Sequence, residues 1–325
     1  MPRHTAITEA APPDPRVPSV EVPQSSTAPR ILRNGPLLLL LSRVFIGAMA
    51  VAVKIACQFL PAGEVTFFRF LGGWLLFWPL ARAGVIDVQA RNRRLTYLRG
   101  TLSGVAIVAY FQAIDRVPVA HAVLMQNTYP LFIAALSIPI LRERAELGTL
   151  GCFAIALAGI AVMLEPSLGS GHAPLFGYAL GLVSAVFAAG AVMATRALRK
   201  TDSAVSIFYY FSLVGSIVSL PVFLADPVVP GGPALAALAI TITLSVIGQL
   251  LLNQAFKYTG AAQGSVVLMA STVVAAGLGA WFMGDRYGVH FLAGAGMIFA
   301  AVTWITARSR PAAVLSAAAE PVPPA

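Results

Sequence analysis

The side chains of this chain that could bind or orient a polar molecule are few, and they lie within long apolar stretches. The neutral polar ones that stand out are amides, at Gln112, Asn127, Gln249 and Asn253. Gln249 and Asn253 are four residues apart, so they share one face of a helix. Burial of an amide costs free energy unless it finds a hydrogen-bond partner. We therefore expect these four residues to face the interior of a helical bundle and to line a cavity there, and hydrogen bonding between helices without a ligand is the alternative.

Charged and titratable candidates form a second group. Lys54, Glu64 and Arg69 lie close to the ends of apolar stretches. Long cationic side chains at such positions can extend to water without a function. Alternatively, Lys54 and Arg69 attract an anionic group of a bound molecule at the outer side, or they pair with Glu64. His121 lies near the start of another apolar stretch, where it could titrate or serve as a hydrogen-bonded polar residue.

Several kinds of chemistry are not expected. The three lysines, at positions 54, 200 and 257, lack the Gly-rich run and the following Ser or Thr of a phosphate-binding loop, so ATP hydrolysis is not predicted. The two cysteines, Cys57 and Cys152, are packing residues without metal-ligand spacing. We predict no catalytic residues, no metal site and no cofactor. A buried carboxylate relay for protons is also missing, because no Asp or Glu falls at the centre of an expected helix.

The elements that must position these residues are membrane helices. Hydrophobic residues make up 58% of the chain and charged residues 11%, whereas a soluble domain carries about a quarter charged residues. The apolar stretches are close to the ~20 residues that a helix needs to cross a bilayer. We expect an all-α integral membrane protein with ten transmembrane helices, at residues 36–60, 64–82, 96–115, 118–141, 147–164, 174–196, 204–224, 234–256, 261–283 and 288–307.

Both ends of the chain have a different composition. Residues 1–30 are rich in proline and small polar residues, and residues 309–325 end in another proline-rich run. Neither segment can bury a core, so we expect both to be disordered. The first apolar run begins only near Pro36, too far along for a cleavable signal peptide, so the first helix is expected to be retained.

Positive charge is distributed unevenly among the connections. The formal net charge of +9 would suit nucleic acid in a soluble protein, but in a membrane protein Lys and Arg gather in cytoplasmic loops. The loops at residues 165–174 and 225–233 contain neither. This pattern predicts a multi-pass inner membrane protein with both termini in the cytoplasm. The cations assigned to the inside are Arg30, Arg33, Arg82, Arg91, Arg93, Arg94, Arg99, Arg142, Arg144, Arg196, Arg199, Lys200, Lys257, Arg308 and Arg310.

The chain also repeats itself at an offset of 142 residues. Polar and proline pairs carry this match, including Lys54 with Arg196, Pro79 with Pro221, Gln112 with Gln254, and Glu143-Arg144 with Asp285-Arg286. The predicted units are residues 36–166 and 174–308, with five helices each. Because five is odd, the second unit enters the membrane in the opposite orientation, which makes an inverted-topology repeat.

Particular motifs add a family resemblance. Val117-Pro118-Val119-Ala120-His121-Ala122, Tyr129-Pro130-Leu131-Phe132, Leu141 to Arg144, and Gly151 to Met163 with Gly159 resemble the fourth and fifth helices of the EamA branch of the drug/metabolite transporter superfamily. Lys54 and the segment Glu64 to Phe70 are similar to that branch as well. Thr272 departs from it, since a proline is expected there in the second half, and Asp285 stands in place of Glu.

The resemblance implies a secondary transporter that works by alternating access. It implies export of small polar metabolites, such as amino-acid-like or nucleoside-containing solutes. For such a transporter, the positions of Lys54, Glu64 and Arg69 make them candidates for gate or solute-charge residues, and His121 is a possible protonation site. The partners would be the solute and the lipid bilayer, without nucleic acid, and a monomer and a homodimer both remain open. Two other functions stay open: a scaffold subunit that transports nothing, and an integral-membrane transferase, for which the only basic cluster is Arg91, Arg93 and Arg94.

Overall fold

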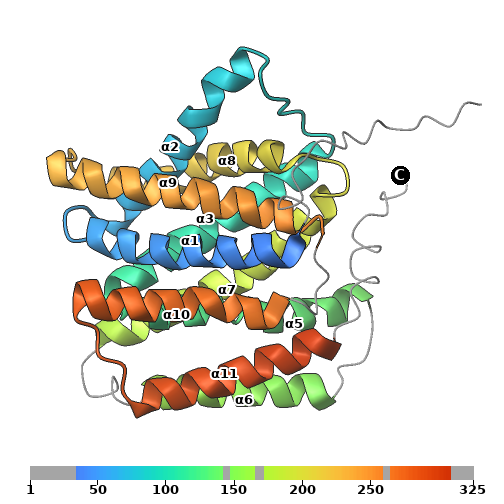
Figure 1. Cartoon of the computed structure of the whole chain (residues 1–325), viewed down its shortest axis with the longest axis vertical. Helices are drawn as coiled ribbons and strands as arrows, with labels where there is room; N and C mark the ends of the chain where they lie inside the picture. The colour runs from blue at the N-terminus through green and yellow to red at the C-terminus, as the bar shows by residue number, and fades with distance from the viewer. Residues whose placement is uncertain (1–33, 142–146, 165–171, 259–263, 309–325) are drawn as a thin grey trace, which may run out of the picture.

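The chain folds as layers of α-helices in the residues that the computed structural model describes, which are 34–141, 147–164, 172–258 and 264–308. Figure 1 shows α9, α1 and α10 running side by side, with α6 and α11 together at one edge and the end of α2 projecting from the opposite edge. The helices are α1 (Gly35–Ala56), α2 (Ala62–Arg82), α3 (Arg93–Arg116), α4 (Val119–Gln126), α5 (Tyr129–Leu141), α6 (Leu147–Leu164), α7 (His172–Leu198), α8 (Ala204–Ala225), α9 (Gly232–Ala255), α10 (Gly264–Met283) and α11 (Val289–Arg308).

The two halves of the chain pack against each other in a crossed pattern. Helix α1 packs mainly on α9 and α10, and α7 packs correspondingly on α3 and on the pair α4 and α5. Helix α2 lies against α8, and α6 lies against α11. A shift of 142 residues converts α1 into α7 and α3 into α9, so the contacts of one half reappear in the other. This architecture of two interlocked repeats agrees with the repeat seen in the sequence.

Five helical spans are long and apolar enough to cross a membrane, among the residues described: Gly35–Ala56, Val119–Leu136, Leu175–Leu198, Ala204–Ala225 and Gly232–Ala255. Shorter apolar helices cover Leu150–Met163, Ala270–Met283 and Val289–Trp304. Helices α2 and α3 fall outside this set although their lengths are 21 and 24 residues. The charged residues that these two helices carry lower their hydropathy.

The helix expected over residues 118–141 is two helices in the structure. Helix α4 ends at Gln126, Asn127 and Thr128 form a turn, and α5 begins at Tyr129. Pro130 has no N–H, and its ring clashes with a helical carbonyl four residues earlier, which disfavours a regular helix through this point, although Pro79 and Pro221 are accommodated within α2 and α8. At the position 142 residues further on, Thr272 can donate a backbone hydrogen bond, and α10 is continuous.

The start of α1 and the end of α11 lie on the same side of the bundle, on the right in Figure 1. Several predictions fall outside the described residues. They are the disorder of residues 1–30, the disorder of residues 309–325, and the placement of the Glu143-Arg144 turn.

Candidate functional site

A cavity of about 80 Å³ lies inside the bundle, bordered by residues from both halves of the chain. Helices α3 and α4 contribute from the first half, and α7, α8 and α9 contribute from the second. The wall is largely apolar and includes the ring of Phe211. Its polar side chains are those of Arg99, Ser103, Gln126, Thr195 and Asn253.

Arg99 is the cation of this cavity. It lies in the first two turns of α3 and is only 4% exposed. Its Nε donates to Oγ1 of Thr195 at 3.0 Å, and its Cζ lies 4.3 Å from the centroid of the Phe211 ring. Its Nη1 is buried and has no hydrogen-bond partner among the described residues. The guanidinium is thus oriented by one hydrogen bond and one aromatic face, with part of its donor capacity unused.

Arg69 of α2 lies against the same aromatic ring. It is 3% exposed, and its Cζ is 5.0 Å from the Phe211 centroid and 4.6 Å from that of Phe70. Its Nε donates to Oγ of Ser245 on α9 at 2.7 Å, while Nη1 has no partner in the described part of the chain. Arg69 therefore lies deeper than the interfacial position expected from the sequence, and it joins Arg99 in a pair of buried cations.

Asn253 supplies an unused acceptor at the cavity. Its side chain is almost completely buried, with Nδ2 donating to the backbone oxygen of Ala204 at 3.3 Å. Its Oδ1 has no partner within the described residues. Gln249, one turn earlier on α9, is half-buried and is not among the residues that line this cavity.

Asn127 joins the two halves instead of lining the cavity. It lies in the turn between α4 and α5, and its Nδ2 donates to Thr272 Oγ1 at 2.9 Å and to Ser271 Oγ at 3.1 Å, both on α10. The side chain is 3% exposed. These hydrogen bonds fix the turn between α4 and α5 to α10, the continuous helix of the second half.

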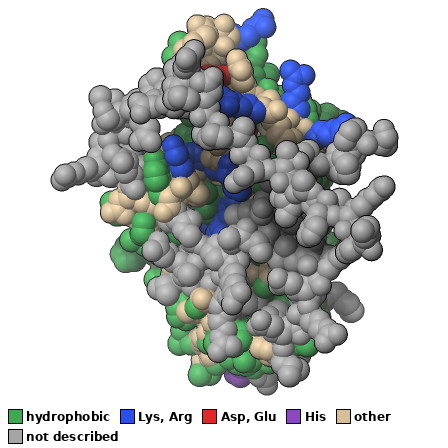
Figure 2. Space-filling model, turned by 90° about the vertical axis from the view of Figure 1, so that its right-hand side faces the viewer, with side chains coloured by type: hydrophobic (Ala, Val, Ile, Leu, Met, Phe, Trp, Pro, Cys, Tyr) green, Lys and Arg blue, Asp and Glu red, His purple; other side chains and the backbone are tan. Residues whose placement is uncertain are grey.

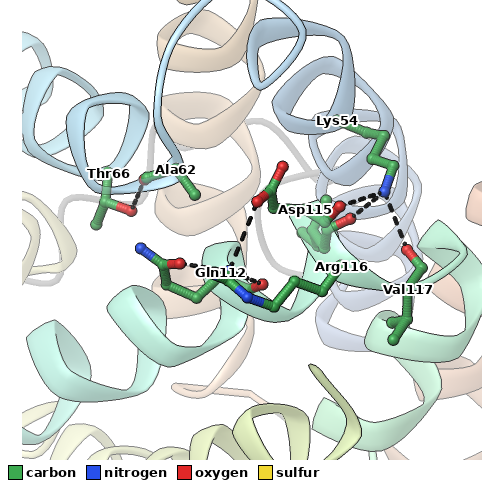
Figure 3. A network of polar contacts seen from close by, with 8 residues as sticks. Lys54, Ala62, Thr66, Gln112, Asp115, Arg116 and Val117 are labelled. Atoms are coloured by element: carbon green, nitrogen blue, oxygen red, sulfur yellow. Dashed lines mark hydrogen bonds and ion pairs between the residues drawn. The ribbon is translucent and has the colours of Figure 1, made fainter. Parts of the chain in front are cut away.

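Lys54 and Gln112 belong to a polar network at the far end of α3 (Figure 3). The Nζ of Lys54 donates to the backbone oxygens of Ile114 and Asp115 at 2.7 and 2.8 Å, and to that of Val117 at 3.2 Å. Carbonyls at a helix C-terminus lack partners within the helix and attract cations. Gln112 Oε1 accepts from Arg116 Nη1 at 2.5 Å in the same network, so neither residue reaches the cavity.

Glu64 is buried in the first turn of α2, with an exposed fraction of 0%. Its Oε1 accepts a hydrogen bond from the backbone N–H of Val228, which lies between α8 and α9 in the other half. The ion pair found in the described residues joins Arg116 to Asp115, at 3.5 Å. Glu64 therefore connects the two halves through a backbone group and forms no ion pair with Lys54 or Arg69.

His121 is packed in an aromatic cluster. Its Nδ1 lies 2.6 Å from the hydroxyl oxygen of Tyr178 on α7, and its ring stacks on Phe291 with centroids 4.8 Å apart and an interplanar angle of 12°. Nearby, Tyr287 donates to Asp285 Oδ2 at 3.0 Å. Burial, followed by the charge of Asp285, raises the pKa of Tyr287, so its phenol stays protonated.

Sequence reasoning missed part of the buried positive charge. Arg99 was grouped with the cytoplasmic loop cations but is buried inside the bundle. Arg43, which was not singled out, is 5% exposed, and its Nη2 lies 3.4 Å from the hydroxyl of Tyr129. Arg196, also grouped with the loops, has its Cζ 5.2 Å from the Phe256 ring centroid. The available signal was the position of these arginines within apolar helices and not beyond their ends.

The charge distribution has a direction. Figure 2 shows the end of the bundle that is on the right in Figure 1, where Lys and Arg side chains gather over its upper half. This end includes the exposed residues Arg91, Arg93 and Arg94 at the start of α3, two turns before Arg99. A surface that carries mainly positive charge raises the local concentration of anionic ligands.

Two interlocked helical repeats with a small, largely apolar cavity between them, bordered by a few polar side chains, are the architecture of many membrane carriers. The comparisons identify its family. The chain matches the EamA-like transporter family over residues 33–165 and 175–307, and it belongs to that family.

Named relatives are membrane transporters. A pseudopaline exporter, CntI, of Pseudomonas aeruginosa strain UCBPP-PA14 is 31% identical over 273 residues, which cover 83% of this chain and 95% of the relative. An S-adenosylmethionine uptake transporter of Rickettsia felis is 26% identical over 200 residues, covering 61% of this chain and 67% of the relative. A solved structure described as a crystal structure of a protein aligns with a TM-score of 0.59 at 18% identity, covering 82% of this chain and 94% of that one. That structural likeness supports the fold. The protein is thus a membrane transporter of the drug/metabolite type and not an enzyme.

Proposed function

We propose that this protein is a secondary transporter that exports small polar, amino-acid-like or nucleoside-containing metabolites by alternating access. The observation that carries the proposal is the cavity between the two repeats, which Arg99 and Asn253 both line and beside which each of them holds a buried hydrogen-bonding atom without a partner in the described residues. Export is favoured over uptake because the exporter named above matches a larger part of the chain at higher identity. The solute would bind where both halves supply walls.

The proposed topology has ten spans in two units, residues 36–166 and 174–308, with both termini in the cytoplasm. Helices α4 and α5 then count together as one broken span, and the second unit is inverted. The cavity lies near the proposed cytoplasmic end, because Arg99 is near the start of α3 whereas Thr195 and Asn253 lie in the last turns of α7 and α9. The Lys54 network then lies at the outer end.

Alternating access requires contacts between the halves to break at one end while they form at the other. At the proposed outer end, Glu64 accepts from the Val228 N–H, and Asp285 Oδ2 accepts from the Val119 N–H at 3.3 Å. At the proposed inner end, Asp202 Oδ1 accepts from the Arg91 N–H at 3.0 Å. We infer that these contacts act as the two gates.

Counterflow into liposomes tests the proposal. The purified full-length protein would be reconstituted and given a panel of labelled amino acids and nucleosides, with protein-free liposomes as the blank. We expect saturable exchange of one solute class, which Asn253→Ala reduces and Gln249→Ala, one turn away and outside the cavity lining, leaves largely intact. Equal loss in both variants would place the site elsewhere. No exchange by folded protein across the panel would support the scaffold function instead.

A further inference from the structure

The interior of the bundle holds more buried positive charge than its own carboxylates neutralise. Arg43, Arg69 and Arg99 are all nearly inaccessible, and each has a buried nitrogen without a hydrogen-bond partner in the part of the chain described. The buried acids, Glu64 and Asp202, accept from the backbone N–H groups of Val228 and Arg91 and form no ion pair there.

Such an arrangement is costly in a membrane protein. Arginine stays protonated in proteins, so the charge cannot be relieved by loss of a proton. A buried charge without a partner destabilises the fold, and within a bilayer such residues mark pathways or sites for charged ligands. The face of Phe211 offsets part of the cost for both Arg69 and Arg99 through cation–π attraction, but it does not satisfy the remaining N–H donors.

We propose that the cavity binds the carboxylate of an anionic solute, with Arg99 as its principal contact and Arg69 as a supporting charge behind the Phe211 ring. A guanidinium matches a carboxylate in a planar, two-pronged geometry. Arg99 lines the cavity and has a free Nη1, whereas Arg69 contacts the same ring without lining the cavity. This inference rests on the proposed transport function and specifies the charge of its solute.

Asn253 offers a hydrogen-bond acceptor where Arg99 offers donors, and this narrows the class of ligand further. Its free Oδ1 is an acceptor, and a buried acceptor needs a donor from the ligand. A solute that carries a carboxylate together with an ammonium or hydroxyl group satisfies both sides of the cavity. The ligand class is therefore an α-amino or α-hydroxy acid, or a larger metabolite that presents such a group.

Thermal unfolding of the purified full-length protein in detergent tests this assignment. The probes are α-amino and α-hydroxy acids and their primary amides, which keep the carbon skeleton but lose the negative charge. A ligand that binds only the folded state raises the unfolding temperature with its concentration. We expect at least one acid to do so, and its amide to have no effect.

Three variants distinguish binding from folding. Arg99→Met keeps an apolar stem but removes the charge, and we expect it to weaken the acid by about 30-fold or more. Arg99→Lys keeps the charge without the planar fork and should retain part of the effect. Arg82→Gln removes an exposed cation on the projecting end of α2 and serves as the control with an unchanged response.

Each outcome is decisive. Stabilisation by an amide as strong as by its acid, or an acid effect that survives in Arg99→Met, would overturn the assignment. Liposome counterflow separates this failure from failure of the proposed function. Exchange of neutral solutes alone, at equal rates in wild type and Arg99→Met, would leave a carrier whose solute is not anionic, whereas no exchange of any solute by folded protein would remove the carrier itself.

Discussion

The backbones of Gly159 in α6 and Gly294 in α11 pass so close that neither position has room for a side chain. A Cβ built on Gly294 would collide with the carbonyl oxygen of Gly159, and one built on Gly159 would lie 2.8 Å from that of Gly294. Small residues at such crossings let membrane helices approach closely. The pair fixes how the last helices of the two repeats meet.

We predict that Gly294→Ala destabilises the protein, because the added methyl group meets backbone that cannot rotate away. Overpacking of this kind costs about 1 to 3 kcal/mol. The matched control is Gly296→Ala on the same helix, where a Cβ would have nothing within 4 Å. Thermal unfolding in detergent compares the two, and equal unfolding temperatures would show that the helices separate more easily than the structure indicates.

Much of this fold was predictable because apolar length and a repeat can be read from residue types alone. The expected helix at residues 204–224 corresponds to α8 at Ala204–Ala225, and that at residues 147–164 matches α6. The break at Asn127 was not predicted, although Pro130 lies within the helix expected over residues 118–141. Sequence does not show whether a proline bends a helix or ends it, since that depends on what the neighbouring helix offers to the freed groups.

The cavity was predictable only in part, because a residue near a helix end can point inward or outward. Asn253 borders the cavity of about 80 Å³, whereas Gln112 lies in the Lys54 network. A solute-binding role of either residue stays a prediction. Arg99 was missed because counting cations by loop treats one just inside a helix like one just outside. Only packing shows that Phe211 lies against it.

The Lys54 network can be probed through a neighbouring thiol. Cys57 follows α1 directly, and burial raises the pKa of its thiol to about 12, with the charge of Asp115 acting in the same direction. Only the thiolate reacts with maleimide. In a Cys152→Ser background, which leaves Cys57 as the single cysteine, we expect the labelling rate to rise about tenfold per pH unit through pH 10, whereas an ordinary thiol levels off near pH 9.

Lys54→Gln should change this behaviour, because it leaves the terminal carbonyls of α3 without their cation. Loss of the Lys54 charge by itself raises the pKa of the Cys57 thiol, but burial is the larger cause of its raised pKa. We expect the end of α3 to loosen and Cys57 to become exposed, so that the effect of burial is relieved and labelling at pH 7 accelerates. Arg286→Gln removes an exposed cation at the same end of the bundle and is the control. Unchanged labelling in Lys54→Gln would mean that packing alone holds this end together.

His121 is expected to have a structural role. Replacement by Gln removes the stacking on Phe291 and disturbs the contact with the Tyr178 hydroxyl, so we predict a loss of about 1 to 3 kcal/mol in stability. The pH dependence of counterflow should keep its shape in the variant, measured as initial rates between pH 5 and pH 8. Loss of that dependence in folded protein would instead assign proton coupling to this histidine.

Asn253→Asp provides the sharpest contrast between stability and binding. The substitution keeps the shape of the side chain but places a carboxylate in the cavity that Arg99 lines. If Arg99 awaits an anionic solute, this carboxylate takes the place of that solute, so the unliganded protein should unfold at a higher temperature than wild type while the effect of added acid disappears. A buried charge without a partner is costly, so supplying an opposite charge beside it is stabilising. A gain of stability together with a loss of binding is typical of residues kept for function. Thermal unfolding with and without the acid measures both quantities in one experiment. A variant that is less stable than wild type and still responds to the acid would show that the charge of Arg99 is already balanced within the protein.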